Sequence, residues 1–339
     1  MRPSLMSPLA YSVLKQLAGG EFRSGEGLAM QIGVSRGSVW NAVRELEDAG
    51  LEIYRVRGRG YRLRETVSLL DADEVMRRLP AGSRLAVEIV PAVPSTNTLA
   101  LERARRNAPS GSVVVAEWQT AGRGRLGRMW QAPLAGALTF SLVWRSAQGA
   151  ASLSGLSLAV GIAIARALRT QGVADAQLKW PNDVVWRDRK LAGILIEMQG
   201  DAWGPTCTVI GAGINVRLPA SMARLIDQAA VDVETAAGHP LDRNALLAAT
   251  LTELETVLEG FGREGFGPLR AEWQRLHAWQ GRKVAITLPD GRVESGIARG
   301  ADRDGALLVA TRGTVRRYHS GEVSLRLAAR SAARLREPT

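Results

Sequence analysis

Gly122-Arg123-Gly124-Arg125-Leu126-Gly127 has the glycine spacing of a dinucleotide-binding turn, but its surroundings contradict that interpretation. A buried strand is predicted just before it, over 112–116, as a Rossmann unit requires. The residues after it do not open a helix, because a proline and a glycine interrupt the next turn. No Asp or Glu occurs between Glu117 and Asp175, so the carboxylate that would bind a ribose is missing. The sequence therefore argues against a nicotinamide-binding unit.

The same stretch has the properties of an anion-binding lid. Its glycines allow a hinged loop, and the loop carries Arg123, Arg125 and Arg128 between Gln119 and Trp130. Backbone N–H groups and guanidinium forks in such a loop can close on a phosphate or a carboxylate. We therefore expect an acidic ligand close to this segment.

Composition limits the class of protein. The chain has 339 residues with ordinary apolar and charged fractions, which predicts two or three globular domains. Its net charge of +11 favours a polyanionic partner, although coding bias can produce the same charge. The single cysteine, Cys207, excludes an internal disulfide framework and suits a cytoplasmic protein, and we expect neither a secretion signal nor a membrane span. The three histidines lie far apart without cysteine partners, so any metal is expected to arrive with a nucleotide.

The first 65 residues have the pattern of a winged helix-turn-helix. Apolar spacing and capping residues predict three helices, one from Pro8 to Leu17, one capped by Ser24 and ending at Ile32, and one capped by Ser35 and ending at Ala49. Gly33 supplies the turn between the last two helices. An arginine-rich hairpin follows, with strands over 53–57 and 61–64, and is typical of a wing that contacts phosphates.

The exposed positions of this unit are the predicted DNA contacts. They are Arg36, Ser38, Trp40, Asn41 and Arg44 on the third helix, and Arg57 and Arg59 in the wing. The alternative is a winged helix that docks on a protein and has a solvated basic face. The density of arginine on both helix and wing favours DNA.

Short polar motifs lie on predicted strands, or at their ends, in the middle of the chain. They are Ser95-Thr96-Asn97-Thr98, Lys179-Trp180-Pro181-Asn182-Asp183, Lys190-Leu191-Ala192-Gly193 and Gly211-Ala212-Gly213-Ile214-Asn215. Each has a structural alternative, such as a helix cap for the first and an Asx turn for the second. Only four of the 44 basic residues are lysines, and two of these, Lys179 and Lys190, fall in this region. Cations, amides and one carboxylate together suggest a nucleotide and an acidic substrate that it activates.

In this order the motifs resemble the biotin protein ligases, and with the N-terminal unit the chain resembles the bifunctional biotin ligases that also repress the biotin operon. The resemblance covers nearly the whole chain, and Leu126 departs from it, since relatives often carry a further basic residue there. The implied fold class is α+β: a winged helix-turn-helix over 1–66, a central α/β biotin/lipoate-ligase-like catalytic domain with a mixed sheet over 67–277, an SH3-like small β-barrel over 278–328, and a disordered tail over 329–339. Short strands with frequent turns after Lys283 agree with a small barrel.

The resemblance also implies roles for individual residues. The expected biotin-binding residues are Ser95, Thr96, Asn97, Gln119, Arg123, Gly124, Arg125, Lys190 and Gly193. The expected nucleotide-binding residues are Trp130, Lys179, Asn182 and Asn215. The expected catalytic residues are Arg125, Lys179, Asp183 and Lys190, with no protein ligand to a metal and with Mg²⁺ bound to ATP.

The implied activity joins two functions. Biotin would react with ATP to give biotinyl-5'-AMP, and the biotinyl group would pass to a lysine of a biotin carboxyl carrier protein. Cations are needed because the attacking carboxylate and the phosphate are both anions, and a lid would protect the water-sensitive adenylate. The adenylate-bound protein would dimerise on operator DNA and repress biotin synthesis genes. Two alternatives stay open, a biotin-sensing repressor without catalysis and a lipoate ligase, although the retained lysines favour catalysis and the Gly-Arg-Gly-Arg lid favours biotin.

Overall fold

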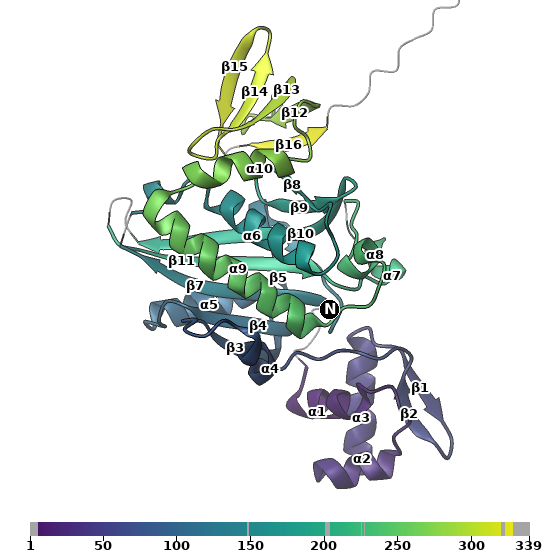
Figure 1. Cartoon of the computed structure of the whole chain (residues 1–339). Helices are drawn as coiled ribbons and strands as arrows, with labels where there is room; N and C mark the ends of the chain where they lie inside the picture. The colour runs from purple at the N-terminus through teal and green to yellow at the C-terminus, as the bar shows by residue number, and fades with distance from the viewer. Residues whose placement is uncertain are drawn as a thin grey trace, which may run out of the picture.

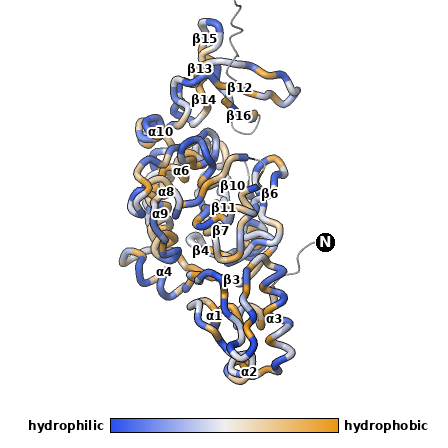
Figure 2. The backbone as a smooth tube through the Cα atoms, turned by 90° about the vertical axis from the view of Figure 1, so that its right-hand side faces the viewer, coloured by the Kyte–Doolittle hydropathy of each residue, from blue (hydrophilic) through white to orange (hydrophobic). Residues whose placement is uncertain are grey.

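The chain folds into three units that follow one another along its long axis, as both views in Figures 1 and 2 show. The computed structural model describes residues 6–147, 149–200, 204–224, 226, 228–319 and 323–327. The tail expected over 329–339 lies outside these residues. Within the described residues, no helix has the length and apolar character needed to cross a membrane.

The N-terminal unit is the predicted winged helix. It contains α1 (Pro8–Leu17), α2 (Gly25–Ile32), α3 (Arg36–Asp48) and the wing strands β1 (Ile53–Val56) and β2 (Gly60–Leu63). The hydroxyls of Ser24 and Ser35 accept from backbone N–H groups at the starts of α2 and α3, as predicted. Gly33 ends α2 with φ 77°, a conformation that favours glycine. The third helix stops one residue before the predicted Ala49, which is its C-cap.

The middle of the chain forms a seven-stranded mixed sheet in the order β3-β4-β7-β11-β10-β9-β8. Its strands are β3 (Ala86–Val93), β4 (Ser112–Gln119), β7 (Ala137–Ser146), β8 (Gln177–Lys179), β9 (Asp183–Trp186), β10 (Arg189–Gly200) and β11 (Thr206–Asn215). Strands β3 and β4 are parallel, and the other neighbours are antiparallel. The accompanying helices are α4 (Ala72–Arg78), α5 (Thr96–Arg105), α6 (Leu156–Thr170), α7 (Ala220–Ala223), α8 (Val233–Ala237), α9 (Arg243–Glu264) and α10 (Arg270–Leu276).

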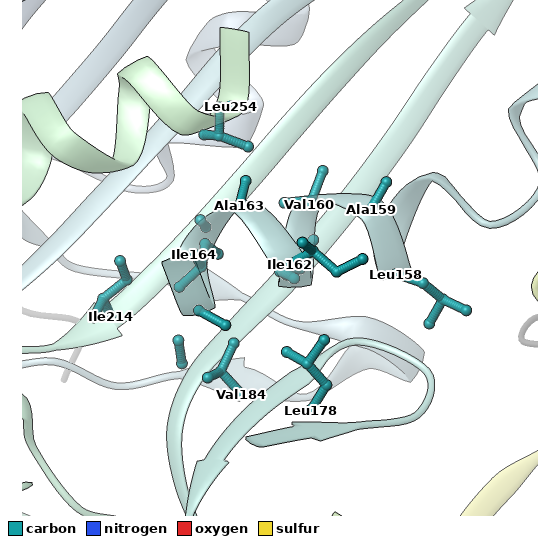
Figure 3. Close-up of a cluster of buried hydrophobic side chains, with 14 of the residues drawn as sticks. Leu158, Ala159, Val160, Ile162, Ala163, Ile164, Leu178, Val184, Ile214 and Leu254 are labelled. Carbon is teal, nitrogen blue, oxygen red and sulfur yellow. The ribbon is translucent and has the colours of Figure 1, made fainter. Parts of the chain in front are cut away.

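Helices cover both faces of this sheet (Figure 1). Alternate residues of β4 serve opposite faces, because side chains alternate along a strand. Val114 belongs to the cluster that includes Ala100 of α5, whereas Val113 and Val115 belong to the main core with α6 and α9. In Figure 3, the side chains of α6 lie among Leu178 of β8, Val184 of β9 and Leu254 of α9. The apolar side chains of α6 are therefore part of the main core.

A buried ion pair fixes the segment that follows the winged helix. Glu117 of β4 and Arg243 of α9 are each 2% exposed and lie 2.7 Å apart. Glu117 also accepts from the N–H of Leu70 at 2.6 Å, and Arg243 donates to the carbonyl of Ser68 at 2.8 Å. Both charges therefore have partners in a region without solvent, as buried charges require. The pair holds the connecting segment against the central unit.

The C-terminal unit is a five-stranded antiparallel sheet in the order β15-β14-β13-β12-β16. Its strands are β12 (Lys283–Thr287), β13 (Val293–Ala301), β14 (Leu307–Thr311), β15 (Thr314–Tyr318) and β16 (Ser324–Leu327). β16 pairs with β12, the first strand of the unit, and lies on the side of the sheet nearest the central unit (Figure 1). This placement brings part of β16 to a cavity of the central unit.

The junction between the last two units makes stability depend on pH. His277 stacks on Trp273, with ring centroids 4.5 Å apart, and burial lowers the pKa of its imidazole to about 4. The unfolded chain therefore binds the proton first, and the folded state should lose stability as the pH falls from the ordinary histidine pKa near 6.5 toward 4. We expect a loss of about 1.5 kcal/mol between roughly pH 6.5 and 5. Chemical denaturation at several pH values measures it.

Two variants separate this effect from general acid sensitivity. His277→Phe keeps an aromatic ring against Trp273 and removes the titrating group, so its stability should change less over this pH range. His239→Gln alters an exposed histidine and should behave like the parent chain. Equal pH slopes for the parent and His277→Phe would contradict the assignment.

Candidate active site

A cavity of about 700 Å³ opens between the central sheet, the glycine-arginine segment and β16. Its size suits a small-molecule ligand. Every residue predicted from the sequence to bind biotin or nucleotide, or to act in catalysis, lines it: Ser95, Thr96, Asn97, Gln119, Arg123, Gly124, Arg125, Trp130, Lys179, Asn182, Asp183, Lys190, Gly193 and Asn215. Residues up to 120 positions apart in the chain thus meet at one place.

A polar wall forms one side of the cavity, at the start of α5. The N–H and hydroxyl of Thr96 donate to Gln119 Oε1 at 2.7 and 3.2 Å. Ser141 Oγ lies 2.8 Å from Thr96 Oγ1 and 2.6 Å from Asn97 Oδ1. Ser95 is the N-cap residue of α5 but makes no side-chain capping bond. A motif that could have served only as a helix cap therefore faces the cavity instead.

Two glycines of β11 allow side chains to cross the sheet surface. A Cβ at Gly211 would lie 1.9 Å from Asn97 Oδ1, and one at Gly213 would lie 2.4 Å from the Trp130 ring. Any larger residue would therefore displace the side chains that line the cavity. The glycine pair explains why this strand can carry a ligand site.

Two buried polar atoms beside Gly213 lack a partner among the described residues. They are Trp130 Nε1, a donor, and Asn215 Oδ1, an acceptor. The amide nitrogen of Asn215 is bonded to the carbonyl of Val231 at 3.1 Å, which fixes the orientation of its side chain. Buried polar groups are normally satisfied, so these atoms fit a site that a polar ligand completes.

Three charged groups form the centre of the cavity. Asp183 begins β9, and its two oxygens lie 2.7 Å from Lys190 Nζ and 3.1 Å from Lys179 Nζ. Burial raises the pKa of Asp183, but the two ammonium groups outweigh it, so its pKa lies below the ordinary value. The carboxylate is therefore ionised at neutral pH and is a weak proton acceptor. The three groups together carry one net positive charge.

The glycine-arginine segment is a short hairpin over the cavity, formed by β5 (Gly122–Arg123) and β6 (Met129–Trp130), and we call this hairpin the lid. Arg123 pairs with Glu197 of β10 at 2.6 Å, and Arg125 donates to Asn182 Oδ1 at 3.2 Å. Burial lowers the pKa of Arg125, although a guanidinium stays charged in a protein. Leu126 at the tip is 68% exposed with φ 55°. The lid therefore brings two guanidinium groups to the cavity and leaves an apolar side chain in solvent.

Several residues of the site were not predicted from the sequence. Ser141 lies on β7, a strand without a recognised motif, and Glu197 lies on β10 beyond the Lys190–Gly193 motif. Both are polar residues within apolar strands, which is the pattern that could have identified them. Arg326 of β16 also lines the cavity, but it reaches the site through the packing of a separate unit, which no local pattern predicts.

The predicted DNA contacts lie on the winged helix, away from the cavity. Arg36, Trp40, Asn41 and Arg44 are exposed on α3, and the Arg44 guanidinium lies 5.0 Å from the centroid of the Trp40 ring. Ser38 is half-buried, and its Oγ lies 2.9 Å from that of Ser35 at the start of the helix.

In the wing, both predicted contacts are exposed. Arg57 lies in the turn between β1 and β2, and Arg59 stacks over Phe22 at 4.1 Å from the ring centroid. The stack holds the Arg59 side chain against the loop between α1 and α2.

Comparison with known proteins matches each unit to a family. Residues 89–215 match the biotin/lipoate A/B protein ligase family, 10–62 match an HTH domain, and 281–326 match the biotin protein ligase C-terminal domain. The bifunctional ligase/repressor BirA of Escherichia coli is 40% identical over 92% of this chain and 95% of its own length. The protein of the same name in Bacillus subtilis is 31% identical over 91% and 95%. The structure of biotin protein ligase from Aquifex aeolicus with biotin and ATP is similar, with a TM-score of 0.61, 28% identity, and coverage of 73% of this chain and 100% of that one.

Proposed function

This chain belongs to the family of bifunctional biotin ligase/repressors, and we propose that it joins biotin to a lysine of a biotin carboxyl carrier protein at the expense of ATP. The observation that carries the proposal is the meeting of the polar wall, the Asp183–Lys190–Lys179 centre and the lid around one cavity. We assign this chemistry to a domain over 67–277, with separate domains over 1–66 and 278–328.

In the first step, a carboxylate oxygen of biotin attacks the α-phosphorus of ATP, and pyrophosphate leaves. The hydroxyls and amides of the polar wall suit the polar head of biotin, which needs both donors and acceptors. Lys190 and Arg125 would lower the repulsion between carboxylate and phosphate and stabilise the charge that moves to pyrophosphate. Trp130 and Asn215, with their unsatisfied buried atoms, would contact the nucleotide.

In the second step, the amine of the acceptor lysine attacks the acyl carbon, and AMP leaves. The lysine must first lose a proton, and the lowered pKa of Asp183 makes this carboxylate a poor acceptor. We therefore assign Asp183 to positioning, since it holds both ammonium groups within 3.1 Å of its oxygens. The lid would exclude water from the bound adenylate until the acceptor lysine binds.

Mg²⁺ is proposed to enter with ATP and to neutralise charge on the phosphates. Asp183 is the one carboxylate among the described residues that line the cavity, and both of its oxygens already face lysines. Across the described part of the chain, no group of three His, Cys, Asp or Glu side chains could hold a metal. Phosphate oxygens and water are therefore the ligands that suit the ion here.

Mass spectrometry of a biotin carboxyl carrier domain tests the proposed transfer. With ATP, Mg²⁺ and biotin, one lysine of the domain should gain a biotinyl group. The domain with that lysine changed to arginine is the matched control and should stay unmodified. Modification with lipoate but not with biotin would instead favour the lipoate ligase alternative.

We further propose that the adenylate-bound protein dimerises and binds a palindromic operator. One winged helix offers few base contacts, and a two-fold dimer doubles them. Footprinting on the chain's own biotin-gene promoter should show protection that requires biotin and ATP, with an affinity that falls steeply with salt. Equal protection with and without the ligands would contradict the coupling. Because operator DNA and ATP are both cytoplasmic, we propose that the protein acts in the cytoplasm.

A further inference from the structure

Trp40 lies at the centre of the solvent-facing side of α3. Its side chain is 42% exposed, whereas the other tryptophans that the structure describes are buried or half-buried. The core of the winged helix is formed by the opposite side of the same helix, through Val39, Val43 and Leu46. The core therefore does not require an indole at this position, and the exposed part of the ring lies on the helix face predicted to contact DNA.

The charged residues around this ring favour the binding of a polyanion. Arg36 and Arg44 lie one turn before and one turn after it, and Arg44 stacks on its face. Two carboxylates of the helix have partners elsewhere: Glu45 accepts a hydrogen bond from Ser7, and Glu47 pairs with Arg55 of the wing. The exposed side of α3 thus presents an apolar ring between two guanidinium groups.

The chemistry of indole limits what it can recognise in a major groove. It has one N–H donor and no acceptor, so it cannot form the paired donor and acceptor bonds that identify adenine. Its apolar face instead matches the single apolar group that an unmodified base pair displays there, the C5 methyl of thymine. We propose that Trp40 determines operator specificity by contacting a thymine methyl in each half-site. The inference rests on the proposed repressor function.

Replacing thymine by deoxyuridine removes this methyl group and leaves every hydrogen-bonding group of the base in place. Each thymine of the footprinted operator is replaced in turn. The affinity of the full-length protein for each duplex is then measured by fluorescence anisotropy in the presence of biotin and ATP. Replacement at one symmetric pair of thymines should lower affinity about fourfold per half-site, which is the effect of losing one buried methyl group. The Trp40→Ala protein should bind the thymine and deoxyuridine duplexes equally.

Arg57→Ala is the matched control, because a wing residue that contacts phosphate should weaken both duplexes by the same factor and keep their ratio. Thermal unfolding checks that each variant is folded. Binding by the parent chain that no deoxyuridine alters would overturn the inference and leave the repressor function intact. A deoxyuridine effect of equal size in Trp40→Ala would also overturn it, since another residue would then contact the methyl. Absence of operator binding by the parent chain would remove the repressor function as well.

Discussion

Replacing Lys190 by alanine is expected to slow the formation of biotinyl-5'-AMP by about 30-fold to 1000-fold. This is the range of about 2–4 kcal/mol that the loss of one charge-stabilising group costs a transition state. The Lys190 ammonium faces the cavity and lies 2.7 Å from Asp183. Without this ammonium group, the reacting carboxylate and phosphate would lose a nearby positive charge, and Asp183 would keep only Lys179 as a partner. Lys179 still pairs with Asp183, so the fold should persist.

Single-turnover measurement of adenylate formation gives the rate of this step directly. Lys283→Ala is the control, because Lys283 is one of the four lysines of the chain but lies exposed on β12. It should leave the rate within a factor of two or so, as exposed substitutions usually do. An undiminished rate in Lys190→Ala would remove Lys190 from the mechanism and leave the other cavity residues to account for the chemistry.

Replacing Arg125 by glycine is expected to speed release of the adenylate about tenfold to a hundredfold. The residue is in the lid, where its guanidinium donates to Asn182 and lines the cavity. Losing one charge-assisted hydrogen bond to the ligand typically costs about 1.5–3 kcal/mol, mostly through faster dissociation. The released adenylate is reactive, so lysines of bystander proteins should become biotinylated. The adenylate off-rate and labelling of an added unrelated protein measure both effects.

Leu126→Gly separates lost charge from added flexibility. It changes the neighbouring lid residue, whose side chain is 68% exposed and uncharged, and glycine suits its φ of 55°. The adenylate off-rate of this variant should stay close to that of the parent chain. If Leu126→Gly released the adenylate as fast as Arg125→Gly, lid rigidity rather than the guanidinium would explain retention.

Local patterns were sufficient to predict the winged helix and most of the cavity. Ser24, Gly33 and Ser35 act on the two or three residues next to them, so their effect is visible in a short stretch of sequence. The motif residues of the cavity were also identifiable, because each combines polar groups or glycines with the end of an apolar strand.

Contacts between distant residues could not be predicted. The ion pair of Glu117 and Arg243 spans 126 positions, and neither residue has a local pattern that indicates burial. Ser141 enters the polar wall only because β7 lies beside β4 and β11 in the sheet. The pairing of Asp183 with two lysines likewise depends on how β8, β9 and β10 align. These contacts depend on strand order and register, which the local motifs do not determine.

Biotin-dependent exchange of labelled pyrophosphate into ATP tests the central claim most directly. Exchange occurs only if the enzyme forms an adenylate reversibly, and it needs neither the acceptor protein nor DNA. The proposed chemistry predicts exchange with biotin, ATP and Mg²⁺, almost none without biotin, and a strong loss in Lys190→Ala. No exchange with biotin, or exchange that lipoate supports and biotin does not, would contradict it.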